Sequence, residues 1–143
     1  DIKNTHEIMK ETKFLEGFSM STYAYQTDFE GNKIIPDQKY RIFGTTIDYL
    51  LEEKIIGFPN YVKIDVDGIE HKILSSAIKM LCHDNIKSII IELNENYKEQ
   101  YNSVLNLMNK NDFILIDKKQ LDSAKNGKFS QTYNYIFNKK NEN

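Results

Sequence analysis

Acidic and amide side chains follow two hydrophobic segments near the middle of this sequence. The first group is Asp65, Asp67 and Glu70, and the second is Glu92, Asn94 and Glu95. In open parallel sheets, ligands bind beyond the carboxyl ends of the strands, so two neighbouring strands would bring both groups into one crevice. Crowded carboxylates repel one another and raise some of their pKa values, which suits a bound cation, a metal ion or proton transfer.

Asp65 and Glu92 are the strongest functional candidates among these residues. Both carboxylates are predicted to lie inside hydrophobic strands, where they cap no helix and need a partner or a role. Asp67 and Glu70 have structural explanations as well, because Asp67 can cap the next helix and the helix dipole favours Glu70 in the first turn. His71 is expected to face solvent on that turn.

The segments that position these groups alternate between strand and helix. β-Branched residues predict a strand over 61–66, in which Lys63 extends as a snorkelling side chain. Apolar residues at helical spacing predict a helix over 69–82, and the nearly continuous apolar run 86–93 predicts an interior strand covered on both faces. Two strands joined by a helix are expected to be parallel, with a right-handed crossover.

The alternation continues on both sides of this unit. Downstream, the pattern predicts in turn a helix, a strand, a polar loop and an antiparallel closing strand, at about 97–108, 113–116, 119–130 and 131–138. Upstream, a helix is predicted over 45–55, with Thr45 and Asp48 as a capping box. Residues 1–43 are expected to be irregular or β, with candidate strands at 18–25 and 40–43 around a turn at 28–32.

Composition argues against several classes of protein. The 143 residues, 40% of them hydrophobic, suffice for one core and therefore one domain. The 19 basic and 21 acidic residues are spread along the chain with a net charge of -2, which does not suit a nucleic-acid partner. No segment has the roughly 20 apolar residues of a membrane helix, so the protein is expected to be soluble and cytoplasmic.

The cysteine and the histidines give no sign of a metal site or a nucleophile. Cys82 is the only cysteine and cannot form a disulfide within the chain, which fits a reducing compartment. It is expected to be a buried structural thiol where a helix ends. His6 and His83 have no partner at ligand spacing, so no zinc site is predicted.

Three runs of this sequence together resemble one family of enzymes. They are Thr46-Ile47-Asp48-Tyr49-Leu50, then Pro59-Asn60-Tyr61-Val62-Lys63-Ile64-Asp65-Val66-Asp67-Gly68-Ile69-Glu70, then Ser88-Ile89-Ile90-Ile91-Glu92-Leu93. Their order and spacing closely resemble the FkbM family of S-adenosylmethionine-dependent methyltransferases, over about residues 44–118.

The resemblance implies a fold and a reaction. The α/β chain would be the C-terminal part of a Rossmann-like class I methyltransferase sheet, with 61–66 as its fourth strand, 86–93 as its fifth and an antiparallel closing hairpin. Residues 1–43 would lie on the acceptor side. The reaction would transfer a methyl group from the cofactor S-adenosylmethionine to a hydroxyl of a sugar or another small molecule, which needs alignment and a base.

The resemblance also implies roles for the acidic cluster. Asp65 or Glu92 would take the proton of the acceptor hydroxyl or hold the cationic donor. Asp65 and Asp67 would border the cofactor. The residues expected to contact the acceptor are Glu70, His71 and Asn94.

The glycine-rich cofactor loop of the family is missing from this chain. Members of the family carry an Asp-x-Gly-Ala-Asn-like turn and a later acidic residue for the cofactor ribose, and neither is present here. The six glycines all lie more than ten residues apart, so no loop brings several backbone N–H groups close to a ligand. Because the chain also begins with Asp rather than Met, we expect a partial sequence that binds little cofactor alone.

Two other functions remain open on the residues alone. Asp65-Val66-Asp67-Gly68 also fits a haloacid dehalogenase-like phosphatase, although Ile69 replaces the usual Thr or Asn and no later pair of acids is placed for magnesium. The other possibility is a non-catalytic α/β module. In that case an incomplete sheet would expose 61–66 as an edge that pairs with a partner protein or with a second copy in a homodimer.

Overall fold

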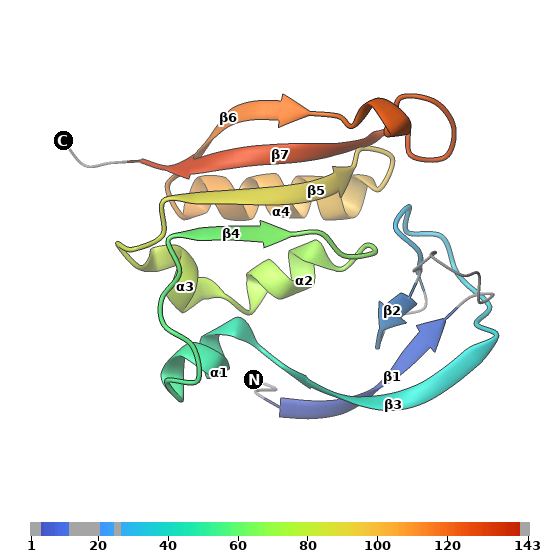
Figure 1. The fold of residues 1–143 in the computed structure, drawn as a ribbon, viewed down its shortest axis with the longest axis horizontal. Helices are drawn as coiled ribbons and strands as arrows, with labels where there is room; N and C mark the ends of the chain where they lie inside the picture. The colour runs from blue at the N-terminus through green and yellow to red at the C-terminus, as the bar shows by residue number, and fades with distance from the viewer. Residues whose placement is uncertain (1–3, 12–20, 25–26, 141–143) are drawn as a thin grey trace.

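A three-stranded antiparallel sheet and a four-stranded mixed sheet make up the described part of the chain (Figure 1). The computed structural model describes residues 4–11, 21–24 and 27–140. The strands are β1 Asn4–Glu11, β2 Ser21–Tyr23, β3 Gln38–Thr45, β4 Tyr61–Ile64, β5 Ser88–Asn94, β6 Phe113–Lys119 and β7 Thr132–Lys139. The helices are α1 Ile47–Glu52, α2 Glu70–Ser75, α3 Ile78–Cys82 and α4 Lys98–Lys110, with a short 3₁₀ turn at Asp122–Ala124. No helix among the described residues is long and apolar enough to cross a membrane.

The four-stranded sheet has the strand order β4-β5-β7-β6. β4 and β5 are parallel, with Ile64 opposite Ile91, which confirms the predicted strand–helix–strand unit. β7 runs antiparallel to both β5 and β6 and lies between them, so the predicted antiparallel hairpin is confirmed as well. Within the described residues β4 pairs with β5 alone, and it therefore forms one edge of this sheet.

Helices α2, α3 and α4 pack on one face of this sheet and form the core with it (Figure 1). In β5, Ile89 and Ile91 are fully buried in that core, whereas Ile90 and Glu92 are partly exposed. The expectation that this strand is covered on both faces is therefore wrong for the described part of the chain. The opposite face of β5 carries Glu92, and the helices do not cover it.

The helix predicted over 69–82 is broken into α2 and α3. The hydroxyls of Ser75 and Ser76 each donate to the carbonyl three residues earlier, and such local hydrogen bonds compete with a continuing helix. α3 then begins anew, with its first backbone N–H groups donating to the Asp48 carboxylate at 2.9 and 3.2 Å. Asp48 thus ties α3 to α1.

Two of the predicted helix caps are wrong. Thr46 rather than Thr45 caps α1, because its Oγ1 accepts a first-turn N–H at 3.1 Å. α2 has no side-chain cap, and Asp67 instead accepts the backbone N–H of Ser21 at 3.2 Å. The carboxylate of Asp67 therefore links the two sheets.

The three-stranded sheet has the order β2-β1-β3, with antiparallel pairs throughout. β2 and β3 overlap the candidate strands at 18–25 and 40–43, although residues 18–20 and 25 lie outside the described part of the chain. β1 was not predicted, because its residues are mostly polar and only one of the eight is buried. The turn at 28–32 is confirmed: Asp28 Oδ1 accepts two backbone N–H groups within it.

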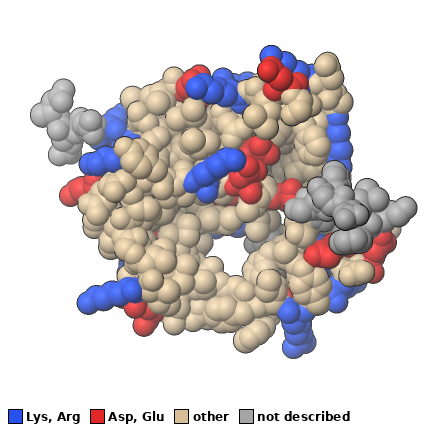
Figure 2. Space-filling model, in the orientation of Figure 1, with Lys and Arg blue, Asp and Glu red and all other residues tan. Residues whose placement is uncertain are grey.

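The two sheets approach each other at two places. β3 leads into α1, and the turn at 28–32 packs against Gly68, just beyond β4. Figure 2 shows an opening between the sheets, with acidic and basic side chains interspersed over this face of the molecule. The N-terminal sheet thus reaches the carboxyl end of β4, where the candidate functional residues lie.

Candidate functional site

Asp65 lies one residue beyond the end of β4. β4 ends at Ile64, so the prediction that Asp65 lies inside a strand is wrong. Its carboxylate is exposed and accepts a hydrogen bond from Lys63 Nζ at 2.5 Å, which gives Lys63 a specific partner rather than a merely snorkelling role. Asp65 therefore lies at the solvent-exposed end of β4, and the ammonium group of Lys63 compensates its charge.

Glu92 lies beside Asp65, on the face of β5 that the helices leave open. It is half-buried and stands opposite Asn134 of β7. Burial raises the pKa of Glu92, and the negative charge of Asp65 raises it further, whereas the Lys63 ammonium lowers it. The structure thus brings together the two carboxylates predicted to be functional, and the surroundings of Glu92 favour its protonated form.

Asp67 faces the same region from the turn after β4. Burial raises its pKa, and the hydrogen bond from the Ser21 backbone opposes that rise. Its charge also raises the pKa of Glu92. Asp67 is therefore close enough to influence the chemistry of Glu92, while it anchors the strand β2.

Glu70 is buried beneath the turn that carries these groups. It is 2% exposed, accepts a hydrogen bond from Gln100 Nε2 at 2.5 Å and receives the Val66 N–H at 3.3 Å. Burial raises its pKa to about 7. Because both of its oxygens are engaged by the protein, Glu70 positions the turn after β4 rather than presenting a free carboxylate.

The other predicted acceptor residues differ in their surroundings. His71 is buried with its ring edge-on to Tyr97, and burial lowers its pKa, so the expectation that it faces solvent is wrong. α4 packs over this turn and covers it. Asn94 is 3% exposed; its Oδ1 accepts the Asn96 N–H, and its Nδ2 has no partner among the described residues.

Glu95 does not join the cluster, contrary to the prediction. Its carboxylate accepts hydrogen bonds from Lys118 Nζ at 2.5 Å and from the hydroxyl of Tyr135. These bonds lower the pKa of Glu95 and hold it on the other side of the sheet end. β5 ends at Asn94, so Glu95 belongs to the turn that follows, where its carboxylate meets Lys118 and Tyr135.

Two adjacent cavities open at this end of the sheet. The smaller, about 30 Å³, has room for a water molecule or a hydroxyl group. It is lined by Phe29, Val66, Asp67, Gly68, Glu70, Glu92, Asn94, Gln100, Phe129 and Thr132. The larger, about 410 Å³, is lined by Glu92, Leu121, Ser123, Ala124, Phe129, Thr132 and Asn134. Glu92, Phe129 and Thr132 line both cavities, so Glu92 lies where they meet.

Several lining residues were not predicted from the sequence. Phe29 comes from the N-terminal turn, Phe129 from the polar loop, and Thr132 and Asn134 from β7. The alternation in β7 already set Thr132 and Asn134 on one face of a strand. Only the β5–β7 register, which pairs Asn134 with Glu92, shows that this is the face of the site.

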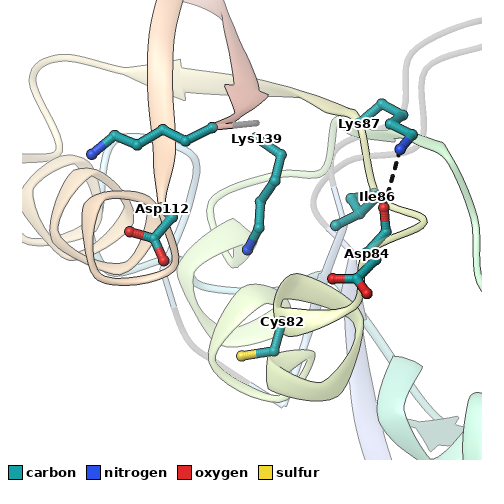
Figure 3. A pocket seen from close by; sticks show the side chains of 7 residues that line it. Cys82, Asp84, Ile86, Lys87, Asp112 and Lys139 are labelled. Carbon is teal, nitrogen blue, oxygen red and sulfur yellow. Dashed lines mark hydrogen bonds between the residues drawn. The ribbon is translucent and has the colours of Figure 1, made fainter. Parts of the chain in front are cut away.

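A third cavity, of about 690 Å³, lies at the opposite end of the sheet (Figure 3). Its lining residues are Cys82, Asp84, Ile86, Lys87, Asp112, Lys139 and Lys140. Lys139 Nζ donates to the carbonyls of Leu81 and Asn111, at 2.8 and 2.7 Å, so it closes the ends of α3 and α4. Cys82 is exposed at this cavity rather than buried as predicted, because α3 ends there, and its thiol donates to Asn111 Oδ1 at 3.3 Å.

Gly31 and Gly68, the two glycines next to the site, do not form a cradle for S-adenosylmethionine. A Cβ on Gly68 would lie 2.6 Å from the Asp28 carbonyl oxygen, and one on Gly31 would lie 2.7 Å from the Tyr97 ring. These close approaches are made to the chain itself and leave no space for a ligand at those backbones. Gly31 and Gly68 therefore cannot approach a cofactor closely, and the described residues at the sheet end supply acidic and polar groups instead.

Comparison with known families identifies the chain. No curated protein and no solved structure matches it. The family model described as the methyltransferase FkbM domain matches residues 6–115, a range that contains most of the three-stranded sheet together with Asp65, Asp67 and Glu92. This match supports methyl transfer over the phosphatase alternative. Members of this family generally use S-adenosylmethionine. The chain belongs to the FkbM family of methyltransferases.

Proposed function

We propose that this chain is the acceptor-side part of an S-adenosylmethionine-dependent O-methyltransferase that acts on a hydroxyl of a sugar or another small molecule. The observation that carries the proposal is the position of Glu92, a half-buried carboxylate of raised pKa at the junction of two cavities. A general base works best when its pKa lies near the operating pH. Burial and the charge of Asp65 both move Glu92 in that direction.

In this proposal the residues of the chain orient the acceptor and take its proton. The smaller cavity admits a hydroxyl group next to Glu92, which accepts the hydroxyl proton as the oxygen becomes the nucleophile. Asp65 keeps that proton on Glu92 by its negative charge, and Lys63 limits the total charge of the pair. Glu70, which accepts a hydrogen bond from Gln100, stabilises the turn after β4.

The sheet is proposed to be the C-terminal part of a Rossmann-like class I methyltransferase. β4 has no partner among the described residues on the side away from β5, and Tyr61 on that strand is 74% exposed. A strand that carries the family's glycine loop would extend the sheet along this edge and hold most of the cofactor. The chain alone is then expected to have little methyltransferase activity.

Pairing with a second copy along β4 is the alternative use of this edge. An antiparallel pair of β4 strands would align Tyr61–Ile64 of each copy with Tyr61–Ile64 of the other. Both copies then contribute the same four residues, as the isologous interface of a two-fold dimer requires. Sedimentation velocity over a range of concentrations tests it, and a monomer at every concentration would rule it out.

The test of the proposed function has two arms. In calorimetry, S-adenosylmethionine and its demethylated product should bind a longer chain that carries the glycine loop, and the present chain should show no low-micromolar binding. In the active longer protein, Glu92→Gln should lower kcat by about 10²–10⁴, the usual contribution of a general base. Glu95→Gln is the matched control, because Glu95 lies near the same strand end but faces away. Unchanged turnover in Glu92→Gln would refute the role of Glu92.

A further inference from the structure

The three-stranded sheet exposes apolar side chains but has no hydrophobic core of its own. Ile8, Tyr40, Ile42 and Phe43 are 38–56% exposed. Within the described residues, the buried side chains of β1, β2 and β3 are all polar, and none of these strands contributes to the hydrophobic core or packs against it. Small sheets are usually stable only when a hydrophobic face packs against another element. This sheet therefore lacks contacts that a partner could supply.

β3 is the strand along which this sheet can grow. It pairs with β1 on one side, has no strand on its other side among the described residues, and forms the outer margin of the sheet in Figure 1. Its side chains are exposed at every position except Gly44, and the strand contains no proline. An unpaired strand of this length presents a row of backbone N–H and C=O groups to another chain.

The basic residues of β3 restrict the registers in which two copies could pair. A two-fold axis between antiparallel strands passes through a residue that lies opposite itself, so this residue defines the register. A register centred on Tyr40 would set Lys39 opposite Arg41, and one centred on Arg41 would set two guanidinium groups opposite each other. Like charges in directly opposed pairs are destabilising, so both registers are disfavoured.

A register centred on Ile42 avoids these repulsions and gives a long ladder. It aligns residues 39–45 of both copies, whereas a register centred on Phe43 aligns only 41–45. It also sets Arg41 of each copy opposite Phe43 of the other. Arg41 makes no hydrogen bond or ion pair with the other described residues, so its guanidinium is available to pack on that ring. The Phe43 ring is already held by His6, edge-on, with the ring centres 5.6 Å apart.

We propose that β3 pairs antiparallel with β3 of a second copy of this chain, with Ile42 opposite Ile42. The two three-stranded sheets then join into one sheet of six strands, in the order β2-β1-β3-β3-β1-β2. The charges favour a second copy because the register satisfies Arg41 of both chains in the same way. The proposal does not depend on the proposed function, since no methyl donor or acceptor takes part in the pairing.

The first experiment is sedimentation velocity of the chain over a range of micromolar concentrations. The sedimentation coefficient should rise with concentration from that of a monomer to that of a dimer. Ile42→Lys would set two ammonium groups opposite each other and should weaken the dimer by at least about ten-fold. Its circular dichroism should be unchanged, because Ile42 lies outside the hydrophobic core. Tyr61→Lys is the matched control and should leave the dimer intact, since Tyr61 is exposed on β4, at the edge of the other sheet.

The second experiment tests the register by disulfide cross-linking, in a chain whose native thiol is removed by Cys82→Ser. In the proposed register the Cα atoms of the two residues 42 lie about 4.5–5.5 Å apart, which a disulfide can span. The two residues 40 are at least about 13 Å apart, because each lies opposite Gly44, and no disulfide spans that distance. Ile42→Cys should therefore give a covalent dimer under mild oxidation, and Tyr40→Cys should not.

Three results would overturn the proposal. The first is a monomer at every concentration. The second is a dimer that Tyr61→Lys dissociates and Ile42→Lys does not, because that dimer would be formed by β4. The third is cross-linking through Tyr40→Cys in preference to Ile42→Cys, which would exclude the register centred on Ile42.

Discussion

Replacing Gly68 with alanine tests the contact between the N-terminal turn and the site. Gly68 has φ of +98°, and a Cβ there would lie 2.6 Å from the Asp28 carbonyl oxygen and 3.1 Å from the Phe29 Cα. Both atoms belong to backbone, which cannot rotate aside as a side chain does. Gly127 is a matched control, because its φ is +92° and nothing lies within 4 Å of the place where its Cβ would be.

The expected magnitudes follow from two separate costs. A positive φ at a residue with a Cβ costs about 1–2 kcal/mol, and both variants incur that cost. Extra volume in a packed contact costs about 1–3 kcal/mol more, and only Gly68→Ala incurs it. Gly68→Ala should therefore lower the free energy of unfolding by about 2–5 kcal/mol and Gly127→Ala by about 1–2 kcal/mol.

Urea denaturation followed by circular dichroism measures both free energies, provided that the slope with urea stays the same. The NMR spectrum of Gly68→Ala should in addition show displaced signals for Phe29 and Phe129, since the turn must move away from the site. Equal losses in the two variants would refute the reasoning. They would mean that the turn at 28–32 does not press on Gly68 in solution.

Three further predictions concern the supports of the site and of the core. Because the folded pKa of Glu70 is about 7 and its ordinary value is 4.5, stability should fall as the pH rises between those values. Glu70→Gln should flatten that fall and be more stable at pH 8 by about 3 kcal/mol, which urea titrations at several pH values can check. Asp48→Ala should cost about 1 kcal/mol in the same assay by uncapping α3, and Asp48→Asn should retain most of that stability. Lys139→Met should cost about 1–3 kcal/mol by leaving two helix-end carbonyls without their donor. The neighbouring Lys140→Met should change the free energy of unfolding by less than about 0.5 kcal/mol.

The central unit could be predicted from the sequence because each of its elements has one dominant periodicity. The β-branched run before Asp65 and the apolar run before Asn94 are short and flanked by turn residues, so strand was the favoured state for both. The helix between them was expected to be continuous. Its interruption depends on the hydroxyls of Ser75 and Ser76, whose competition with the helix is decided by the backbone around them.

The N-terminal sheet could not be predicted in the same way. β1 pairs with β3 along its whole length, from Asn4 opposite Thr45 to Glu11 opposite Gln38, yet its sequence is largely polar. Sheets that are exposed on both faces lack the alternation on which such predictions depend. Hydrogen bonds of the backbone, which any residue except proline can make, hold this strand in place.

The site was predicted only in part, because the partners of its side chains come from segments that are distant in the sequence. Glu92 and Glu95 were predicted for the same crevice, but Glu95 lies in the turn after β5 and is bound by Lys118 and Tyr135 instead. His71 was expected in solvent, and α4 covers it. In both cases tertiary contacts, with Lys118 and Tyr135 for Glu95 and with the neighbouring helix for His71, decided the outcome.

Two segments that are far apart in the sequence shield Glu92 from water and so control its pKa. Phe29, from the N-terminal turn, and Phe129, from the segment before β7, both line the smaller cavity, and their rings are in contact. Burial is the largest cause of the raised pKa of Glu92, so a change that separates these two rings admits water and lowers that pKa. A carboxylate that is more easily ionised is a weaker base, and the acceptor hydroxyl would lose its proton less readily. Displacing either aromatic ring should therefore weaken proton transfer at Glu92, even though neither ring touches the transferred proton.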